Sequence, residues 1–240
     1  MEFIGKRAVI TGGLGGIGSA ISYALRCAGA EVTATGYDQA EANAAVGNPI
    51  LAGITLAPLD VGDDAAVQAF AERTGAIDFL VNCAGTTARG PEAFEEAAFQ
   101  HVVDVNLTGT MRCCRAFRAA LSRRGGAIVN IASVMSYSGS GTAPGYAASK
   151  GGVALLTKSL AMAWAEHNIR VNAVAPGWIT TPLTDQQIDP LLRERVIART
   201  PMRRWGEPRF IADAVEFLCS DKASFITGAI LPVDGGYLAT

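Results

Sequence analysis

Short apolar runs alternate with longer amphipathic stretches along the whole chain. We predict strands from the short runs, at 7–11, 31–35, 54–59, 77–82, 127–131, 170–174 and 229–233. These runs are rich in aliphatic residues and show little polar alternation, which is typical of strands buried on both faces. The last run contains Pro232, which cannot donate a ladder hydrogen bond, so we place that strand at an edge of the sheet.

The amphipathic stretches predict helices at 16–27, 63–74, 94–122, 146–167 and 208–220, with a shorter basic helix at 193–199. Strands that alternate with helices favour a parallel, doubly wound sheet with helices on both faces. No repeat, linker or low-complexity tract interrupts this pattern. We therefore predict an α/β protein with a Rossmann-type sheet of about seven strands, formed by a single domain over residues 1–240.

Composition excludes several kinds of partner. The chain has 20 basic and 22 acidic residues and no basic stripe, which argues against binding to nucleic acid. No apolar run is long enough to span a bilayer, and the first residues lack the order of a signal peptide. Half of the residues are hydrophobic and only 18% are charged, which indicates much buried surface, in a covered sheet, in subunit contacts, or in both.

The cysteines and histidines show no pattern of a metal or redox site. The five cysteines lack CxxC spacing, so we interpret them as reduced structural residues of a cytoplasmic protein. His101 and His167 lie far apart in the sequence, so we expect no metal site.

A glycine-rich turn follows the first predicted strand, with the sequence TGGLGGIG from Thr11 to Gly18. The missing side chains let the backbone approach a nucleotide pyrophosphate, and the free amides and helix dipole at the helix start attract its negative charge. The spacing fits three glycine patterns at once, so by itself it does not distinguish between dinucleotide-binding families. A flexible glycine loop is the plainer interpretation, which the position directly after a strand disfavours.

The end of the second predicted strand bears on the choice of cofactor. An acidic residue there bonds the adenosine ribose hydroxyls and repels a 2′-phosphate, whereas a nearby arginine binds that phosphate. Gly36 occupies this position, Tyr37 follows, and Asp38 comes two residues late. Neither this turn nor the glycine-rich turn contains a lysine or arginine, which favours NAD and leaves NADP open.

Tyr146 and Lys150 lie four residues apart at the start of a predicted helix, so they share one helix face. A phenol has a pKa of about 10, and a nearby lysine cation is expected to lower it. Tyr146 can then accept a proton from an alcohol or donate one to a carbonyl group. This spacing alone is weak evidence, because common residue types produce it by chance.

Ser133 lies just past the fifth predicted strand, at the sheet edge where ligands bind in such folds. Its hydroxyl group could hydrogen-bond a substrate oxygen and stabilise the charge that develops there. A turn or helix-capping role is the better interpretation of Ser133 considered alone. Because Tyr146 and Lys150 follow in the chain, we prefer the catalytic interpretation of Ser133.

Together these motifs resemble the short-chain dehydrogenase/reductase family over essentially the whole chain. TGGLGGIG is similar to the family's TGxxxGxG loop, which selects the glycine pattern of Gly12, Gly16 and Gly18. Four further segments resemble family motifs in the same order: DV at 60–61, NCAG at 82–85, VNLTG at 105–109 and PGWITT at 176–181. In the second of these segments Cys83 replaces the usual alanine.

The resemblance implies a role for each matching residue. Asn106, Ser133, Tyr146 and Lys150 would form the catalytic tetrad, in which Asn106 holds a water that passes protons to Lys150. Lys150 would also bond the nicotinamide ribose, Asp60 would meet the adenine ring, and the segment 176–181 would contact the carboxamide. The implied cofactor-binding residues are Gly12, Leu14, Gly16, Ile17, Gly18, Tyr37, Asp60, Val61, Asn82, Ala84, Gly85, Tyr146, Lys150, Pro176, Gly177, Ile179 and Thr181.

The resemblance also implies an NAD(P)-dependent oxidoreductase that interconverts a secondary alcohol and a ketone by hydride transfer. The small-molecule substrate stays open among a sugar, a sugar acid, a 3-oxoacyl thioester, a small cyclic ketone and a polyol. Two other functions could use the same fold. A non-catalytic dinucleotide-sensing regulator generally lacks the tyrosine or the lysine, and an NAD-dependent sugar epimerase or dehydratase generally has an additional domain.

Residues 181–204 would cover the substrate, because the equivalent segment does so in the family. The arginines at 193–199 could meet an anionic substrate, but a solvated helix face is the preferred interpretation. Related chains form tetramers, or dimers through two long helices, which here correspond to 94–122 and 146–167. We expect a homotetramer, with a homodimer as the alternative.

Overall fold

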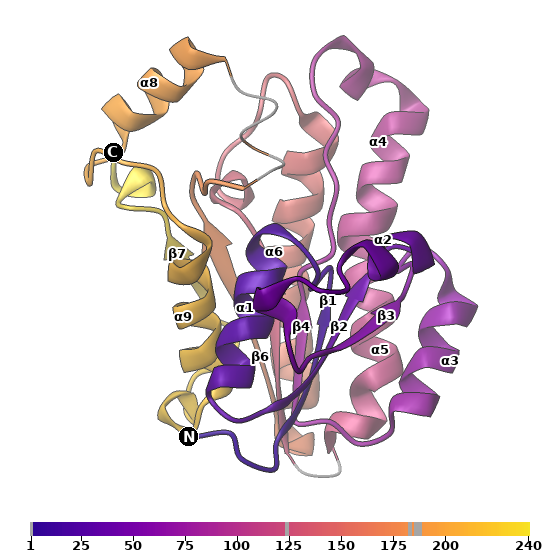
Figure 1. Ribbon diagram of the computed structural model, residues 1–240. Helices are drawn as coiled ribbons and strands as arrows, with labels where there is room; N and C mark the ends of the chain where they lie inside the picture. The colour runs from indigo at the N-terminus through magenta and orange to yellow at the C-terminus, as the bar shows by residue number, and fades with distance from the viewer. Residues whose placement is uncertain (1, 123–124, 182–183, 185–188) are drawn as a thin grey trace.

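The computed structural model describes residues 2–122, 125–181, 184 and 189–240, and its strands form one parallel sheet (Figure 1). The strand order is β3-β2-β1-β4-β5-β6-β7, and every neighbouring pair is parallel. The strands are β1 (Arg7–Thr11), β2 (Glu31–Gly36), β3 (Thr55–Pro58), β4 (Phe79–Asn82), β5 (Gly126–Ile131), β6 (Ile169–Pro176) and β7 (Ile230–Val233). This confirms the doubly wound α/β sheet, with Pro232 in the edge strand β7.

Helices cover both faces of the sheet. The described helices are α1 (Gly16–Cys27), α2 (Gln39–Ala44), α3 (Asp64–Thr74), α4 (Glu96–Val103), α5 (Gly109–Ser122), α6 (Pro144–Trp164), α8 (Pro190–Arg199) and α9 (Pro208–Cys219). The helices α1 and α9 pack side by side on one face, whereas α3, α5 and α6 lie on the other (Figure 1). In the described part of the chain, none of these helices has both the length and the apolar surface that a membrane span requires.

Alternate side chains of each strand enter two separate cores. Ile10 on β1 and Val81 on β4 pack with α1 and α9, whereas Val9 and Leu80 pack with α3 and α5. Both sets of side chains are almost completely buried. Two-sided burial is the physical reason for the absence of polar alternation in the strands.

The prediction of one continuous helix over 94–122 is wrong. A π-helical turn, Asp104–Thr108, separates α4 from α5, and a short 3-10 turn (Pro91–Phe94) precedes α4. A π turn inserts one residue into the helical repeat, so the apolar pattern on either side still resembles one helix. The turn matters for function because it carries Asn106.

Two smaller differences affect the ligand edge of the sheet. Helix α2 was not predicted, because it is only six residues long and its N-cap, Asp38, resembles a loop residue. Helix α6 begins at Pro144, two residues before Tyr146, because proline is well suited to the first helical turn, where no N–H partner is required. Tyr146 therefore lies in the first turn of α6.

The order of the strands fixes where a ligand can bind. The chain proceeds outward from β1 to β3, then crosses to β4 on the other side of β1 and continues outward to β7. In such sheets the crevice opens at the carboxyl ends of the strands, next to this change of direction. The loops after β1, β4, β5 and β6 all lie at that edge, which is the upper edge in Figure 1.

Candidate active site

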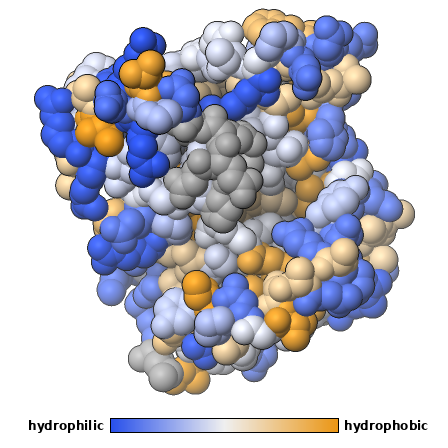
Figure 2. Space-filling model, turned by 45° about the horizontal axis from the view of Figure 1, so that its top comes forward, coloured by the Kyte–Doolittle hydropathy of each residue, from blue (hydrophilic) through white to orange (hydrophobic). Residues whose placement is uncertain are grey.

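Figure 2 looks onto the carboxyl edge of the sheet, where the loops that follow the strands meet. Hydrophilic residues dominate its upper left, on the side of α8, and apolar residues are interspersed among them. The predicted site residues come from several segments of this edge: the glycine-rich turn after β1, the loop after β4, the π turn after α4, the loop between β5 and α6, and the segment after β6.

The backbone segments of the glycine-rich turn pack closely against each other and against the loop after β4. A β-carbon on Gly18 would overlap the carbonyl oxygen of Gly12 and lie 2.9 Å from the Cα of Gly13. A β-carbon on Gly12, whose φ is +62°, would lie 2.7 Å from the Cα of Ala84. Gly16 is at φ +51° next to Thr181, where a β-carbon would be 3.6 Å away. The turn thus has the shape that lets backbone amides surround a pyrophosphate.

Thr11 connects this turn to the loop after β4. Its Oγ1 accepts hydrogen bonds from the backbone N–H groups of Cys83 and Ala84, at 3.2 Å each. These bonds hold two segments that both resemble family motifs against each other. Burial raises the pKa of the Cys83 thiol to about 11, so Cys83 stays protonated and unreactive at neutral pH.

The expected position of the adenosine is at the end of β2. A β-carbon on Gly36 would be 2.8 Å from Oε2 of Glu41, and the same oxygen accepts a hydrogen bond from the Tyr37 N–H at 2.5 Å. The side chain of Leu14 packs beside them, and the Tyr37 side chain is exposed. The Asp38 carboxylate instead caps α2, because it accepts the Glu41 N–H at 2.8 Å.

Sequence reasoning missed Glu41. The spacing of Asp38 and Glu41 is that of a capping box, in which the second side chain turns back toward the start of the helix. That signal could have placed the Glu41 carboxylate near Gly36. The Glu41 carboxylate of α2 therefore lies beside Gly36, at the position where an acidic residue was expected.

Asp60 and Val61 lie past β3, where the resemblance places the adenine ring. Asp60 Oδ1 accepts the Gly62 N–H at 2.7 Å, which fixes the carboxylate in the turn. Val61 is buried, and a β-carbon on Gly109 would lie 2.8 Å from its side chain. This contact attaches the turn to the start of α5.

Ser133 is held next to the helix that carries Tyr146 and Lys150. It caps a 3-10 turn (Val134–Ser136), since its Oγ accepts the Met135 N–H at 3.1 Å. Ser136 then donates its hydroxyl to the carbonyl oxygen of Lys150 at 2.7 Å. The expected alternatives for Ser133, a cap or a catalytic position, are therefore compatible, because the cap fixes where its hydroxyl lies.

Tyr146 is partly buried beside Ser133, and Lys150 is buried behind it. Burial raises the pKa of the Tyr146 phenol, and the hydrogen bond with Ser133 and the charge of Arg89 oppose this rise. The Lys150 ammonium lies 5.7 Å from the centre of the Tyr146 ring and donates to the carbonyl oxygen of Ile131 at 2.6 Å. The expectation that Lys150 lowers the pKa of Tyr146 is wrong for the protein alone, because desolvation dominates.

Asn106 is almost completely buried in the π turn, with its amide fully engaged. Oδ1 accepts the Thr86 N–H at 2.8 Å, and Nδ2 donates to the Thr86 carbonyl at 2.9 Å and to Ser149 Oγ at 3.0 Å. A β-carbon on Gly85 would lie 3.2 Å from Asn106 Oδ1 and 3.8 Å from Lys150 Nζ. The structure thus brings Asn106 and Lys150 to the same side of the loop after β4.

The side chain of Asn82 points into the core. Its Nδ2 donates to Asn130 Oδ1 at 2.9 Å and contacts Cys114 Sγ at 3.2 Å. Asn130 in turn donates to Thr157 on α6 at 2.9 Å. This buried network couples β4, β5, α5 and α6, so Asn82 can support the cofactor edge through its backbone position.

The segment after β6 completes the expected cofactor residues. Pro176 ends β6, and the N–H of Gly177 donates to the carbonyl oxygen of Val233 at 3.0 Å. Ile179 is buried, and the N–H of Thr181 donates to Thr184 Oγ1 at 2.9 Å. Because Thr181 also lies beside Gly16, this segment reaches the glycine-rich turn. Ile17, the residue after Gly16, is partly buried and packs against the hydrophobic core between the sheet and the helices α1 and α9.

Known proteins are similar to this chain in both sequence and fold. The family described as enoyl-(acyl carrier protein) reductase matches residues 12–238. The cis-4-hydroxycyclohexanecarboxylate dehydrogenase of Sinomonas cyclohexanicum is 39% identical, covering 99% of this chain and 98% of its own length. Galactitol 2-dehydrogenase (L-tagatose-forming) of Cereibacter sphaeroides is 42% identical, with coverages of 97% and 95%. The chain belongs to the short-chain dehydrogenase/reductase family.

A solved relative supports the same conclusion. The crystal structure of a putative 2-deoxy-D-gluconate 3-dehydrogenase from Agrobacterium tumefaciens, with bound NADP, superposes with a TM-score of 0.89 at 37% identity. The match covers 100% of this chain and 98% of that chain. As a short-chain dehydrogenase/reductase, the protein is an oxidoreductase of the class that interconverts alcohols and ketones with NAD(P).

Arg89 is a second residue that sequence reasoning missed in this short-chain dehydrogenase/reductase. Its guanidinium group lies 5.8 Å from the centre of the Trp178 ring, and its charge acts on Tyr146. Trp178 packs against Trp205, with ring centres 5.5 Å apart. The sequence contained no signal for this contact, because Arg89 and Trp178 lie in loops that follow different strands.

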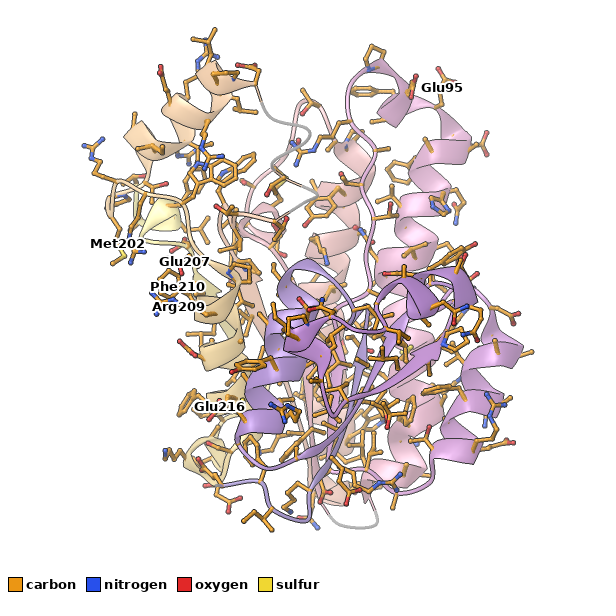
Figure 3. The ribbon with its side chains drawn as sticks, viewed as in Figure 1. Glu95, Met202, Glu207, Arg209, Phe210 and Glu216 are labelled. Atoms are coloured by element: carbon orange, nitrogen blue, oxygen red, sulfur yellow. The ribbon has the colours of Figure 1, made fainter. Side chains whose placement is uncertain are left out.

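Two cavities lie away from the catalytic residues. One, of about 290 Å³, is lined by Trp178, Met202 and Phe210, and Figure 3 labels the last two near the upper end of α9. A larger one, of about 570 Å³, lies at the amino ends of the strands, next to Gly126 and Ile169. Neither is lined by Tyr146, so cavity size alone does not identify the site of a short-chain dehydrogenase/reductase.

The α8 arginines agree with a mainly solvated helix face. Arg193 and Arg199 are exposed, and they stack over Trp205 at 4.7 Å and Tyr237 at 4.2 Å. These contacts attach α8 to the segments that follow it in the chain.

Burial of Lys150 predicts a pH dependence of stability. Desolvation lowers the pKa of Lys150 from 10.5 to about 8, so the unfolded chain binds more protons than the folded protein between these two values. The free energy of unfolding should therefore rise with pH in this window, by about 3 kcal/mol, relative to a Lys150→Met variant that lacks the titration. Urea denaturation of both proteins at pH 7, 9 and 10.5 measures this difference, and equal pH dependence in the two would contradict it.

Proposed function

We propose that this protein is an NAD-dependent dehydrogenase/reductase in which Tyr146 is the general acid/base. The observation that carries the proposal is the position of Tyr146 at the carboxyl edge of the sheet, where Ser133 acts on its phenol and the Lys150 ammonium lies 5.7 Å from its ring centre. In the oxidative direction Tyr146 accepts the hydroxyl proton of the alcohol, and in the reductive direction it returns a proton to the carbonyl oxygen. A nicotinamide dinucleotide, when bound, would exchange the hydride with the carbon atom that carries this oxygen.

The neighbouring residues have separate roles in this proposal. Ser133 donates its hydroxyl to the substrate oxygen and stabilises the negative charge that forms there. Lys150 would bond the nicotinamide ribose, and its ammonium group lies 5.7 Å from the centre of the Tyr146 ring. Asn106 fixes the loop after β4 and links Lys150 to a proton path. The three hydrogen bonds that Asn106 makes with Thr86 and Ser149 support a rigid position for this path.

The cofactor site is proposed to hold the pyrophosphate on the glycine-rich turn and the adenosine at the end of β2. A cradle that a single β-carbon on Gly18 would fill supports this assignment. The Glu41 carboxylate, beside Gly36, supports NAD over NADP, because it would bond the ribose hydroxyls and repel a 2′-phosphate. The NADP-bound relative makes this selectivity a point that experiment must decide.

Substitution of Glu41 by glutamine should weaken the discrimination against NADP. Glutamine keeps an oxygen that can accept the Tyr37 N–H but removes the negative charge, so the α2 start is preserved while the repulsion of a 2′-phosphate is lost. We expect the Kd ratio of NADP⁺ to NAD⁺ to fall about tenfold or more, with NAD⁺ affinity changing only a few fold. Calorimetric titration with both dinucleotides measures the ratio, and an unchanged ratio would refute the role of Glu41.

A broader experiment tests the proposed function itself. Calorimetric titration with NAD⁺, NADH, NADP⁺ and NADPH identifies the dinucleotide, and turnover is then screened with secondary alcohols and ketones. The first compounds are cis-4-hydroxycyclohexanecarboxylate, galactitol and 2-deoxy-D-gluconate, because the relatives are named for these compounds. Failure of all four dinucleotides to bind would remove the basis of the proposal.

We also propose a homotetramer located in the cytoplasm. Two apolar side chains on α6, Leu155 and Met162, are 66% and 84% exposed, which suits a helix that packs against a second subunit. The five cysteines are free thiols, as expected where the environment is reducing. Native light scattering distinguishes a tetramer from a dimer or a monomer.

A further inference from the structure

Arg89 is a partly buried cation without a counter-charge in the described residues. Its Nε is buried and has no hydrogen-bond partner, and no carboxylate of the described chain forms an ion pair with the guanidinium group. Removing a cation from water is unfavourable unless an anion or hydrogen-bond acceptors replace the lost hydration. The contact with Trp178, at 5.8 Å, lies near the limit of a cation–π interaction and compensates only weakly.

The backbone around Arg89 holds this cation at the catalytic edge. The N–H of the next residue, Gly90, donates to the carbonyl oxygen of Thr142 at 2.9 Å, two residues before α6 begins. Tyr146 follows in the first turn of that helix. On the other side Trp178 is fixed by Trp205 and by the hydrogen bond from the Gly206 N–H to the Trp178 carbonyl at 2.9 Å. Arg89 thus lies close to Trp178 on one side, and its charge acts on Tyr146 on the other.

We propose that Arg89 binds the carboxylate of the substrate, which is therefore a hydroxy acid or keto acid whose reacting carbon lies at Tyr146. A guanidinium group carries one charge and a planar pair of donors, which matches a carboxylate in both charge and geometry. Trp178 then provides an apolar surface for the carbon skeleton between the two ends. This inference rests on the proposed function for the reaction, and it adds the class of substrate.

Binding rather than turnover tests the subsite. Cyclohexanecarboxylate and cyclohexanecarboxamide have nearly the same shape and differ in charge, and neither has an alcohol to oxidise. Each is titrated calorimetrically into the full-length protein, alone and saturated with its preferred dinucleotide. We expect the carboxylate to bind at least tenfold more tightly than the amide. Equal affinities for the two compounds would overturn the proposal.

Variants of Arg89 identify the group responsible. Arg89→Met should reduce carboxylate affinity at least tenfold and change amide affinity less than threefold, whereas Arg89→Lys should keep part of the preference. Arg209→Met is the matched control, because Arg209 lies at the outer side of α9 in Figure 3, next to Glu207. It should leave both affinities unchanged. A preference that persists in Arg89→Met would overturn the proposal, as would its loss in Arg209→Met.

The two proposals fail in different ways. If the carboxylate preference depends on Arg89 but hydroxy acids are not turned over with any dinucleotide, the subsite is present and the proposed reaction is wrong. If turnover is found but neutral alcohols are used as well as acids and Arg89→Met affects both equally, the reaction stands and the subsite is wrong. Should Arg89→Met fold poorly, Arg89→Lys and Arg89→Gln, checked by dinucleotide affinity, give the same comparison.

Discussion

Replacement of Tyr146 by phenylalanine should lower kcat by about a thousandfold, within the range expected for loss of a positioned acid/base. In the proposed mechanism the phenol oxygen exchanges a proton with the substrate, and phenylalanine keeps the ring that lies near Lys150 while removing this oxygen. Dinucleotide affinity should change less than about threefold, because the glycine-rich turn is untouched. Steady-state kinetics and calorimetric titration of the same preparation measure both quantities.

Tyr137→Phe is the matched control for this substitution. Tyr137 lies on the same loop as Ser133, is 52% exposed, and donates its hydroxyl to the carbonyl oxygen of Ile230 at 3.3 Å. Loss of that peripheral hydrogen bond should leave kcat within a few fold of the wild-type value. Near-normal turnover in Tyr146→Phe would show that another group transfers the proton.

Replacement of Gly18 by alanine should abolish measurable dinucleotide binding and destabilise the fold by about 1–3 kcal/mol. The new methyl group would overlap the Gly12 carbonyl, and every close neighbour is backbone, so no flexible side chain can yield. The turn and the start of α1 must therefore separate, and the amides that face the pyrophosphate lose their arrangement. Thermal denaturation and calorimetric titration measure the two effects.

Gly15→Ala provides the comparison within the same turn. A β-carbon on Gly15 meets nothing within 4 Å, and its φ of −141° is open to any residue. Affinity and stability should both stay near the wild-type values. Equal effects of the two substitutions would mean that the close approach at Gly18 does not shape the cofactor site.

Much of the fold was predictable because its signals are local. The apolar runs located every strand of the described sheet within a few residues, and the glycine-rich turn marked the start of α1. The π turn at Asp104–Thr108 escaped prediction, because one inserted residue leaves the apolar pattern of α4 and α5 almost unchanged. Helix α2 was not predicted, because a six-residue helix is too short to show a periodic pattern of apolar residues.

In the candidate site, too, the local features were predictable from the sequence and the features that depend on packing were not. Tyr146 and Lys150 were identifiable, because residues four apart on a helix share a face wherever that helix lies in the fold. The direction of the Tyr146 pKa was not, because it depends on how much water the surrounding loops exclude.

The sequence by itself determined the parallel sheet, through the alternation of strand and helix patterns. It also determined the glycine-rich turn and the tyrosine–lysine pair, since each is a motif within a short stretch of chain. Only the tertiary structure decided that Glu41 occupies the acidic position beside Gly36 and that Arg89 faces Trp178 near Tyr146. Glu41 reaches Gly36 only after α2 folds back, and Arg89 meets Trp178 only when the loops after β4 and β6 converge. Charge that acts through space depends on such distances, and distances between separate segments are set by packing.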